Sequence, residues 1–231
     1  MFRSLLSGLG RHLPSQCAIC HAWPARALCE DCVQAFGQPV PRCRRCALPV
    51  LAGMTLCGAC LREPPPLDQA LAAVPYAYPW AGLMTQFKFQ QHTGWAEALA
   101  TLMRSTPWVE PALEQADWLL PMPLSASRLR ERGYNQALLL ARALGHARLR
   151  ADILLRVRDT PPQSAQSRQQ RLHGLHGAYA LEPQWAGLVR NTRIVLVDDV
   201  MTTGASLHAA ARVLRQAGAA HITGLVCART E

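Results

Sequence analysis

The chain has 231 residues and a formal net charge of +9, with 24 lysine and arginine residues against 15 acids. This length allows one ordinary hydrophobic core and a small additional module. No apolar run reaches the roughly 18 residues of a membrane span, and residues 1–16 lack the apolar stretch of a secretory signal. We therefore expect no membrane span and a cytoplasmic protein.

The spacing of the cysteines predicts bound metal. Eight of the nine cysteines form Cys-x-x-Cys pairs between residues 17 and 60. Both thiolates of such a pair can bind one ion, and four thiolates complete a closed tetrahedral zinc site, so two structural zinc ions are expected. A redox role for the pairs is the competing interpretation. We favour sequential sites over an interleaved arrangement: Cys17, Cys20, Cys29 and Cys32 at the first, and Cys43, Cys46, Cys57 and Cys60 at the second.

Three prolines at positions 64–66 divide the chain. Because prolines stiffen a spacer and cannot continue a helix, we expect a linker at residues 64–67. The predicted organisation is an N-terminal extension at 1–16, a double zinc-binding, zinc ribbon-like module at 17–63, and an α/β domain at 68–231.

Strands and helices are interspersed after the linker. Apolar patterns predict strands at 71–78, 119–120, 153–157, 194–197 and 222–228, and helices at 93–103, 137–144 and 207–215. The run at 194–197 is typical of a strand buried on both faces of a parallel sheet. Lys88, between two phenylalanines, is either a snorkelling lysine among core aromatics or a lysine that faces a substrate. Cys227 is expected to be a buried apolar filler.

Arginine is concentrated in residues 128–171, which hold ten arginines and three acids. Arg128, Arg130 and Arg132 precede Gly133 in a predicted strand-to-helix connection, where the backbone can surround an anion. A solvated helix start rich in arginine is the alternative interpretation.

The segment 158–177 shows no sustained periodicity, which is typical of a lid or of a disordered segment. As a lid, it would bring Arg168 or Arg171 over a bound anion and exclude water.

Two carboxylates and a small polar loop follow the strand at 194–197. Asp198 and Asp199 come first, and the loop then leads into the helix at 207–215; its residues are Thr202, Thr203, Gly204, Ala205 and Ser206. Ligands of open α/β sheets bind beyond the carboxyl ends of the strands, and a helix N-terminus attracts an anion. The loop thus predicts a phosphate site, and the acids can accept hydrogen bonds from sugar hydroxyls or hold water on Mg²⁺. Together these indicate a ribose 5-phosphate, whereas a simple helix cap is the alternative.

Residues 195–206 resemble the 5-phosphoribosyl-1-pyrophosphate (PRPP) binding motif of type I phosphoribosyltransferases. The resemblance implies a parallel sheet flanked by helices, preceded here by the small zinc-binding module of four-cysteine sites. It also implies that Asp198 and Asp199 hold the ribose during catalysis, that residues 202–206 bind the 5-phosphate, and that Mg²⁺ accompanies PRPP. The pyrophosphate loop implied by the resemblance comprises Arg132, Gly133, Tyr134 and Asn135.

Further motifs, with the cysteine pairs, resemble the competence protein ComF family over about residues 17–229. They are Pro-Met-Pro-Leu at 121–124, Arg-Glu-Arg-Gly-Tyr-Asn-Gln at 130–136, Thr-Pro-Pro-Gln at 160–163 and Gly-Ala-Tyr at 177–179. Gln170 and Gly174 depart from the acid and the asparagine expected in the lid. The resemblance implies a cytoplasmic protein of natural transformation that handles incoming single-stranded DNA, with DNA-uptake proteins as partners.

Three functions follow from these expectations. The favoured one is a PRPP-binding protein that handles DNA, with Arg128, Arg130 and Arg132 on the phosphates of a single strand. The second is an active phosphoribosyltransferase that releases pyrophosphate, although no stretch identifies its acceptor. The third is a regulatory adaptor that senses PRPP.

Overall fold

The computed structural model describes residues 15–90, 92–158 and 177–231. The chain divides into two compact units, Met1–Gln38 and Pro39–Glu231. The predicted lid, with Arg168, Gln170, Arg171 and Gly174, lies outside the described residues. No helix in the described part of the chain is long and apolar enough to cross a membrane.

The first unit is a small cysteine-containing fold. The backbone N–H of Ser15 donates to the carbonyl of Ala25 at 2.9 Å, which closes a loop around the first Cys-x-x-Cys pair. Helix α2 (Glu30–Phe36) begins directly after Cys29, the first cysteine of the second pair.

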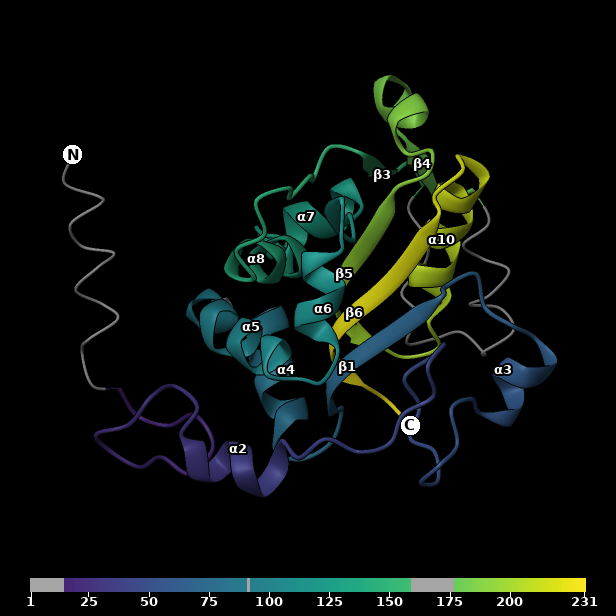
Figure 1. Ribbon diagram of the computed structural model, residues 1–231. Coiled ribbons are helices and arrows are strands. Elements are labelled where there is room, and N and C mark those ends of the chain that lie inside the picture. Colours follow the sequence, from purple (N-terminus) through teal and green to yellow (C-terminus); the bar gives the residue numbers. More distant parts are fainter. Residues whose placement is uncertain (1–14, 91, 159–176) are drawn as a thin grey trace. The chain divides into compact units, whose positions relative to one another are not determined.

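The second unit is built on a parallel sheet of four strands in the order β1-β6-β5-β2 (Figure 1). The strands are β1 (Gln69–Pro75), β2 (Trp118–Pro121), β5 (Arg193–Met201) and β6 (His221–Arg229). Leu196 of β5 lies opposite Leu120 of β2 on one side and Gly224 of β6 on the other. The central strands are buried on both faces, as the apolar run at 194–197 predicts.

Helices cover both faces of the sheet (Figure 1). The helices α4 (Trp80–Phe89), α5 (Ala96–Arg104) and α8 (Gln136–Ala143) lie on one face, and α10 (Ala205–Gln216) lies on the other. Leu207 and Leu214 of α10 are almost completely buried, which confirms the helical spacing expected there. Shorter elements connect them: η1 (Thr93–Trp95), α6 (Val109–Glu114), α7 (Ala126–Arg132) and η3 (Pro183–Leu188).

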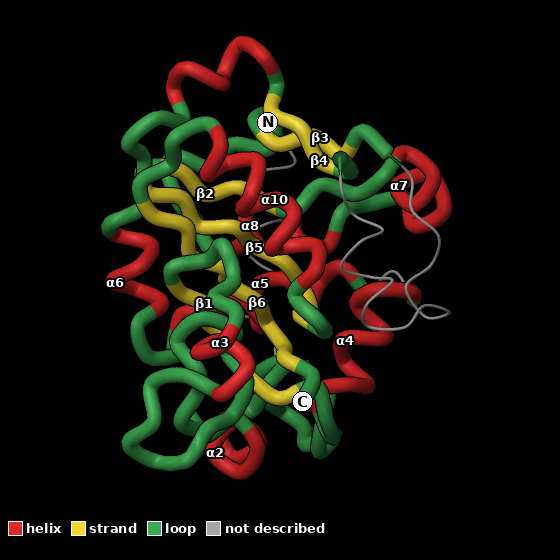
Figure 2. Tube along the Cα trace, turned by 90° about the vertical axis from the view of Figure 1, so that its right-hand side faces the viewer, coloured by secondary structure: helices red, strands yellow, loops and turns green. Residues whose placement is uncertain are grey.

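Two strands differ from expectation. β5 continues to Met201, so the two aspartates lie within the strand and not after it; the neighbouring β6 is equally long and pairs with this extension, Met201 with Arg229. The strand expected at 153–157 is the short β3 (Leu154–Arg156), which pairs antiparallel with β4 (Tyr179–Leu181), apart from the main sheet and next to α10 (Figure 2).

The second group of cysteines is part of the core of the second unit. Cys43 and Cys46 are buried together with Leu67 and with Leu207 of α10. The short helix α3 (Gly58–Arg62) carries Cys60 into the same core. The linker expected at 64–67 therefore lies inside this unit, because the cysteine turns pack against the sheet. Folding of residues 17–63 as one module stays a prediction. Cys227 on β6 is fully buried, as expected.

Candidate functional site

A polar cavity lies where β5 and β2 approach their C-terminal ends. Its wall brings together two acids and four bases from four elements. The charged lining residues are Lys88, Arg128, Arg132, Arg156, Asp198 and Asp199. Polar lining comes also from Asn135, Gln136, Tyr179 and Ser206.

The acid pair holds one base directly. The ammonium nitrogen of Lys88, near the end of α4, lies 3.1 Å from Oδ2 of Asp199 and 3.3 Å from its Oδ1. The Asp199 side chain is only 8% exposed, so this ion pair is screened little by water. Of the two interpretations open for Lys88, the structure thus favours the lysine that faces a ligand cavity.

This arrangement disfavours the ionised form of Asp198. Burial, followed by the neighbouring charge of Asp199, raises the pKa of Asp198 to about 7, although Lys88 acts in the opposite direction. The backbone N–H of Asp199 donates to Oδ1 of Asp198 at 2.9 Å and fixes that side chain. A carboxyl with this pKa can change its protonation state near neutral pH.

Three arginines line the same cavity as the acid pair. Arg128 and Arg132 come from α7, and Arg156 comes from β3. Burial, and then the charges of Arg156 and Arg132, lower the pKa of Arg128, so the three guanidinium groups are close enough to repel one another. The Nε atom of Arg132 is buried and has no hydrogen-bond partner in the described part of the chain. Such a cluster of guanidinium donors is suited to a polyanion.

The segment from Gly133 to Gln136 positions Lys88. The Tyr134 hydroxyl donates to the carbonyl of Phe87, and Nε2 of Gln136 donates to the carbonyl of Lys88 at 3.1 Å. Both bonds attach the C-terminal end of α4 to the start of α8. The Asn135 side chain caps α8 by accepting from Leu138 N at 3.2 Å.

Gly204 begins α10 and determines the shape of the predicted phosphate loop. Its φ is +78°, a conformation that favours glycine, and a Cβ there would lie 2.5 Å from Cε of Met201 and 2.8 Å from Nε2 of His208. Because glycine lacks a capping side chain, the first turn of α10 has no cap from its own N-cap residue. The backbone N–H groups of a helix's first turn are the donors that its N-terminus offers to an anion.

A buried arginine donates hydrogen bonds to the start of this loop. Arg229, at the end of β6 and 4% exposed, donates from Nη1 to the carbonyl of Met201 at 3.1 Å and to that of Thr202. Its Nε donates to the carbonyl of Cys46 at 2.8 Å. One side chain thus joins the start of the phosphate loop to the second cysteine group.

The structure unites most of the predicted ribose and pyrophosphate residues and separates others. Asp198, Asp199, Arg132, Asn135 and Ser206 all line the cavity. Thr202, Thr203 and Gly204 precede α10, and Ala205 is its first residue, whereas Arg130 is exposed on α7.

Sequence reasoning missed several lining residues. Arg156 and Tyr179 belong to the β3–β4 pair, and the guanidinium carbon of Arg156 lies 5.5 Å from the centre of the Tyr179 ring. The Gly-Ala-Tyr motif at 177–179 was the signal that pointed to Tyr179. Nothing in the periodicity indicated that β3 would reach the cavity.

The eight paired cysteines form two groups, and the grouping is the sequential one that was favoured. Sulfurs of Cys17 and Cys32 are 3.9 Å apart, those of Cys20 and Cys29 3.7 Å, and those of Cys46 and Cys57 3.6 Å. Four sulfurs at about 2.3 Å from a central zinc ion would be roughly 3.8 Å from one another, so both groups fit Zn²⁺.

Backbone donors favour thiolates in both groups. Although burial opposes it, N–H groups of Cys20, Cys29 and Ile19 lower the pKa of Cys17 to about 6. Burial also opposes ionisation of Cys43, but backbone N–H groups, among them that of Cys57, lower its pKa to about 7. These N–H groups would stabilise metal-bound thiolates in the same way.

Comparisons with known proteins agree with this geometry. The family described as "Phosphoribosyl transferase domain" matches residues 131–230. The "DNA utilization protein YhgH" of Salmonella typhimurium (strain LT2) is 32% identical over 94% of this chain and 98% of its own length. "Competence protein F" of Haemophilus influenzae is 31% identical over 84% of this chain and 87% of its own.

The predicted fold class is confirmed by the matching family, the parallel sheet with flanking helices and the preceding groups of four cysteines. A solved structure titled "Structure of the allosteric regulatory enzyme of purine biosynthesis" shows a weaker likeness. Its TM-score is 0.40 at 18% identity, covering 62% of this chain and 30% of that one.

Proposed function

Because the chain belongs to the ComF family of competence and DNA-utilization proteins, we propose that it binds PRPP with Mg²⁺ and takes part in handling single-stranded DNA. The observation that carries the PRPP site is the acid pair of β5, which lines one cavity together with three arginines and with Ser206 in the first turn of α10. Few ligands other than a phosphorylated sugar with a second anionic group would satisfy all three.

Each part of PRPP has a counterpart in the second unit. The 5-phosphate binds the N–H groups at the start of α10 and the hydroxyls of Thr202, Thr203 and Ser206. The ribose hydroxyls donate to Asp198 and Asp199. The pyrophosphate accepts from Arg128, Arg132 and Arg156, which line the same cavity. The buried Nε of Arg132 has no hydrogen-bond partner among the described residues and is one donor open to it.

The metals have separate roles. Mg²⁺, when bound, would neutralise part of the pyrophosphate charge, with the two aspartates holding its water. Two Zn²⁺ ions would occupy the two four-cysteine groups as closed, structural sites, since four thiolates leave no position open for water.

The DNA-handling part of the proposal has its support in the names of the relatives and in the excess of arginine. Of the three arginines first expected to bind DNA, Arg130 is exposed, whereas Arg128 and Arg132 line the cavity. We assign those two primarily to pyrophosphate, and Arg130 to the DNA backbone.

Titration calorimetry with PRPP and Mg²⁺ tests the site. Replacing both acids, Asp198→Asn with Asp199→Asn, should lower the affinity at least about a hundredfold, because each lost charged acceptor costs about 1.5–3 kcal/mol. Asp31→Asn, at an exposed position on α2, is the matched control and should bind as the parent does. Unchanged PRPP affinity in a folded double variant would refute the assignment.

A second candidate function, an active phosphoribosyltransferase, is favoured by Lys88 beside the acid pair. In that reaction a nucleophile forms a bond to C1 of the ribose while the C1–O bond to pyrophosphate breaks, and the arginines stabilise the departing anion. Pyrophosphate release from PRPP, with and without single-stranded DNA, separates this enzyme from a PRPP-binding protein or sensor. Release that is lost in Lys88→Met and kept in Asp31→Asn would establish turnover; PRPP binding without release would exclude it under those conditions.

A further inference from the structure

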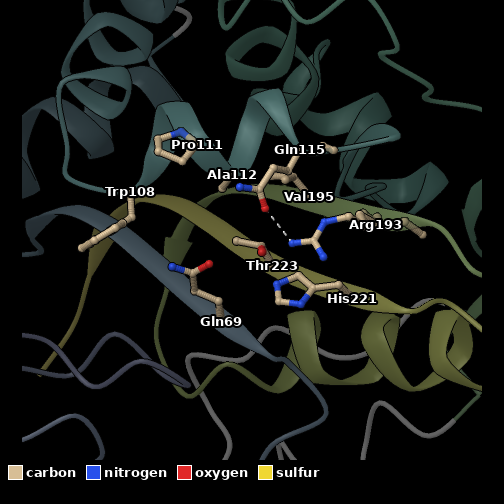
Figure 3. A pocket seen from close by; sticks show the side chains of 11 residues that line it. Gln69, Trp108, Pro111, Ala112, Gln115, Arg193, Val195, His221 and Thr223 are labelled. Carbon is tan, nitrogen blue, oxygen red and sulfur yellow. Dashed lines mark hydrogen bonds between the residues drawn. The ribbon is translucent and has the colours of Figure 1, made fainter.

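A groove crosses the second unit at the opposite end of the sheet from the PRPP cavity. It consists of two adjoining hollows that share Gln69 and Trp108. The smaller hollow, shown in Figure 3, lies between α6 and the first residues of β5 and β6. The larger, of about 770 Å³, runs along β1, the edge strand of the sheet, towards the chain at 39–44.

Trp108 stands where the two hollows meet. Its side chain is 70% exposed, and its backbone is left-handed with φ of +70°. A bulky residue in this conformation costs free energy, and such strain persists where the surroundings impose it, often at a binding surface. The strained backbone holds a large, flat, apolar ring at the surface, where its faces are exposed to water.

The groove is cationic. Arg42 and Arg44 line the larger hollow, and Arg193 lines the smaller one. His221, also in the smaller hollow, adds no charge near neutral pH, because burial lowers its pKa. No aspartate or glutamate is among the described residues that line either hollow. The Arg44 side chain has no hydrogen bond or ion pair to any described residue, and Arg193 uses Nη2 for Oε1 of Gln115 at 2.9 Å, which leaves further donors (Figure 3).

Acids next to the groove act on Arg42 and His221: the charge of Glu231 acts on Arg42, and Oδ2 of Asp68 lies 3.9 Å from Nδ1 of His221. Asp68 forms an ion pair with Arg215 and accepts from the backbone N–H of Ile222 at 2.8 Å. Asp117 accepts from the backbone N–H of Arg193 at 2.8 Å and pairs with Arg148 at 3.4 Å. Arg44 and Arg193 therefore keep side-chain donors for an anion from outside.

From this arrangement we infer that the groove is a binding site for single-stranded nucleic acid, in which a base stacks on Trp108 while Arg44 and Arg193 bind the flanking phosphates. Stacking platforms combined with basic side chains are the means by which proteins bind single strands with little sequence preference. Gln69 and Thr223, on the floor between Trp108 and Arg193 in Figure 3, offer amide and hydroxyl groups to a base edge.

A peptide laid along β1 would suit the apolar lining of the larger hollow, but it leaves the arginines without partners unless it is acidic. A nucleic acid uses both the ring and the charges, so it accounts for more of the groove. The inference rests on the proposed role in DNA handling. It names a site for the strand that is separate from the PRPP cavity, because Arg193 begins β5 and the acid pair lies towards its other end.

The test measures fluorescence anisotropy of a labelled oligothymidylate with the zinc-loaded full chain. Trp108→Ala should weaken binding about tenfold or more, as expected for a lost stacking partner, and Trp108→Phe should keep most of the affinity. Trp23→Ala, at a tryptophan 65% exposed in the first unit, is the matched control and should bind as the parent does. An abasic oligonucleotide of equal length should not distinguish Trp108→Ala from the parent.

Charge variants test the phosphate contacts. Arg44→Glu with Arg193→Glu should weaken binding at least tenfold and lower the salt slope by about 1.4, at roughly 0.7 for each phosphate contact to a single strand. Arg62→Glu, at an exposed arginine outside both hollows, controls for net charge. PRPP affinity, measured on the same samples, should not change.

The outcomes separate the two proposals. A parent protein that binds no oligonucleotide would overturn both DNA handling and the groove. If the parent binds but Trp108→Ala and the double charge variant bind equally well, the groove fails alone, as it would if it served a peptide. A loss confined to Arg130→Glu would place the strand on α7 and also overturn the inference.

Discussion

Asp198 and Asp199 are adjacent in β5, and the ammonium group of Lys88 pairs with Asp199. The carboxyl of Asp198 is left in a buried setting beside a like charge, and its pKa rises to about 7. A carboxyl whose ionised form is disfavoured in this way is typical of residues that bind a ligand. The same arrangement predicts that the residue lowers the stability of the unliganded fold at alkaline pH.

Asp198→Asn should therefore raise the melting temperature at pH 8 and change it little near pH 4. The folded pKa of about 7 lies above the unfolded value of 3.8, so the folded state binds the proton more tightly. Stability is thus lost as the pH rises from about 4 to 7, and the full cost, at most about 4 kcal/mol, is present above pH 7. Thermal unfolding across this range measures it.

Asp199→Asn serves as the comparison, because it relieves Asp198 but leaves Lys88 without its partner. Its gain at pH 8 should be smaller than that of Asp198→Asn. Equal melting temperatures for parent and Asp198→Asn at pH 4 and pH 8 would show that the carboxyl is not strained.

At the scale of elements, the parts of the fold with strong local signals could be predicted. The helix at 207–215 and the strand at 194–197 were predictable because their apolar residues follow the period of each element. The end of β5 was not, since aspartates normally terminate a strand and only the length of its neighbour β6 extends the pairing past Asp199. Tertiary pairing decided against local propensity.

The site divides in the same way. Cys-x-x-Cys spacing and the loop after Asp199 are local patterns, so the sequence alone predicts a metal site and a phosphate site from them. Lys88, Arg156 and Tyr179 reach the cavity from separate elements. The sequence left two interpretations open for Lys88 and gave only a short motif for Tyr179, and Arg156 is revealed by the packing of the β3–β4 pair. Arg229, near the end of the chain, carried no local signal for its contacts with Cys46 and Met201.

The contacts of Arg229 predict a coupling between the second cysteine group and the phosphate loop. Arg229→Met should leave the carbonyls of Cys46, Met201 and Thr202 without this donor, destabilise the second unit by about 2–4 kcal/mol, and loosen the turn before α10. Faster hydrogen exchange at residues 202–206 and weaker PRPP binding are the expected readouts. Arg212→Met, at an exposed position on α10, is the control.

Zinc loss should reproduce this effect from one group only. Cys57→Ser, in the second group, should also speed exchange at 202–206, because Cys46 of that group accepts from Arg229. Cys29→Ser, in the first group, should not. Similar exchange at these residues in Arg229→Met and the parent would contradict the coupling.

At the scale of the whole molecule, the two cysteine groups belong to different compact units. Metal analysis of the purified protein, washed with a weak chelator, should return about two zinc ions per chain, one for each closed four-cysteine site. Each of Cys29→Ser and Cys57→Ser should lose close to one of them. One equivalent or none in the parent would end the two-site assignment.

The two losses should differ in their effect on stability. Cys57→Ser should lower the melting temperature of the second unit by several degrees, since Cys43, Cys46 and Cys60 are part of its core. Cys29→Ser should leave the melting of that unit unchanged.

If the cavity beside the acid pair in β5 binds PRPP as proposed, protons and ligand compete there. Ribose hydroxyls and hydrated Mg²⁺ both favour the ionised carboxylate, whereas the empty cavity favours its protonation up to about pH 7. Entry of the proposed ligand near neutrality would then expel a proton, and a fall in pH would weaken its binding at constant ligand concentration. The occupancy of the cavity would thereby report the acidity of its surroundings as well as the supply of the nucleotide precursor.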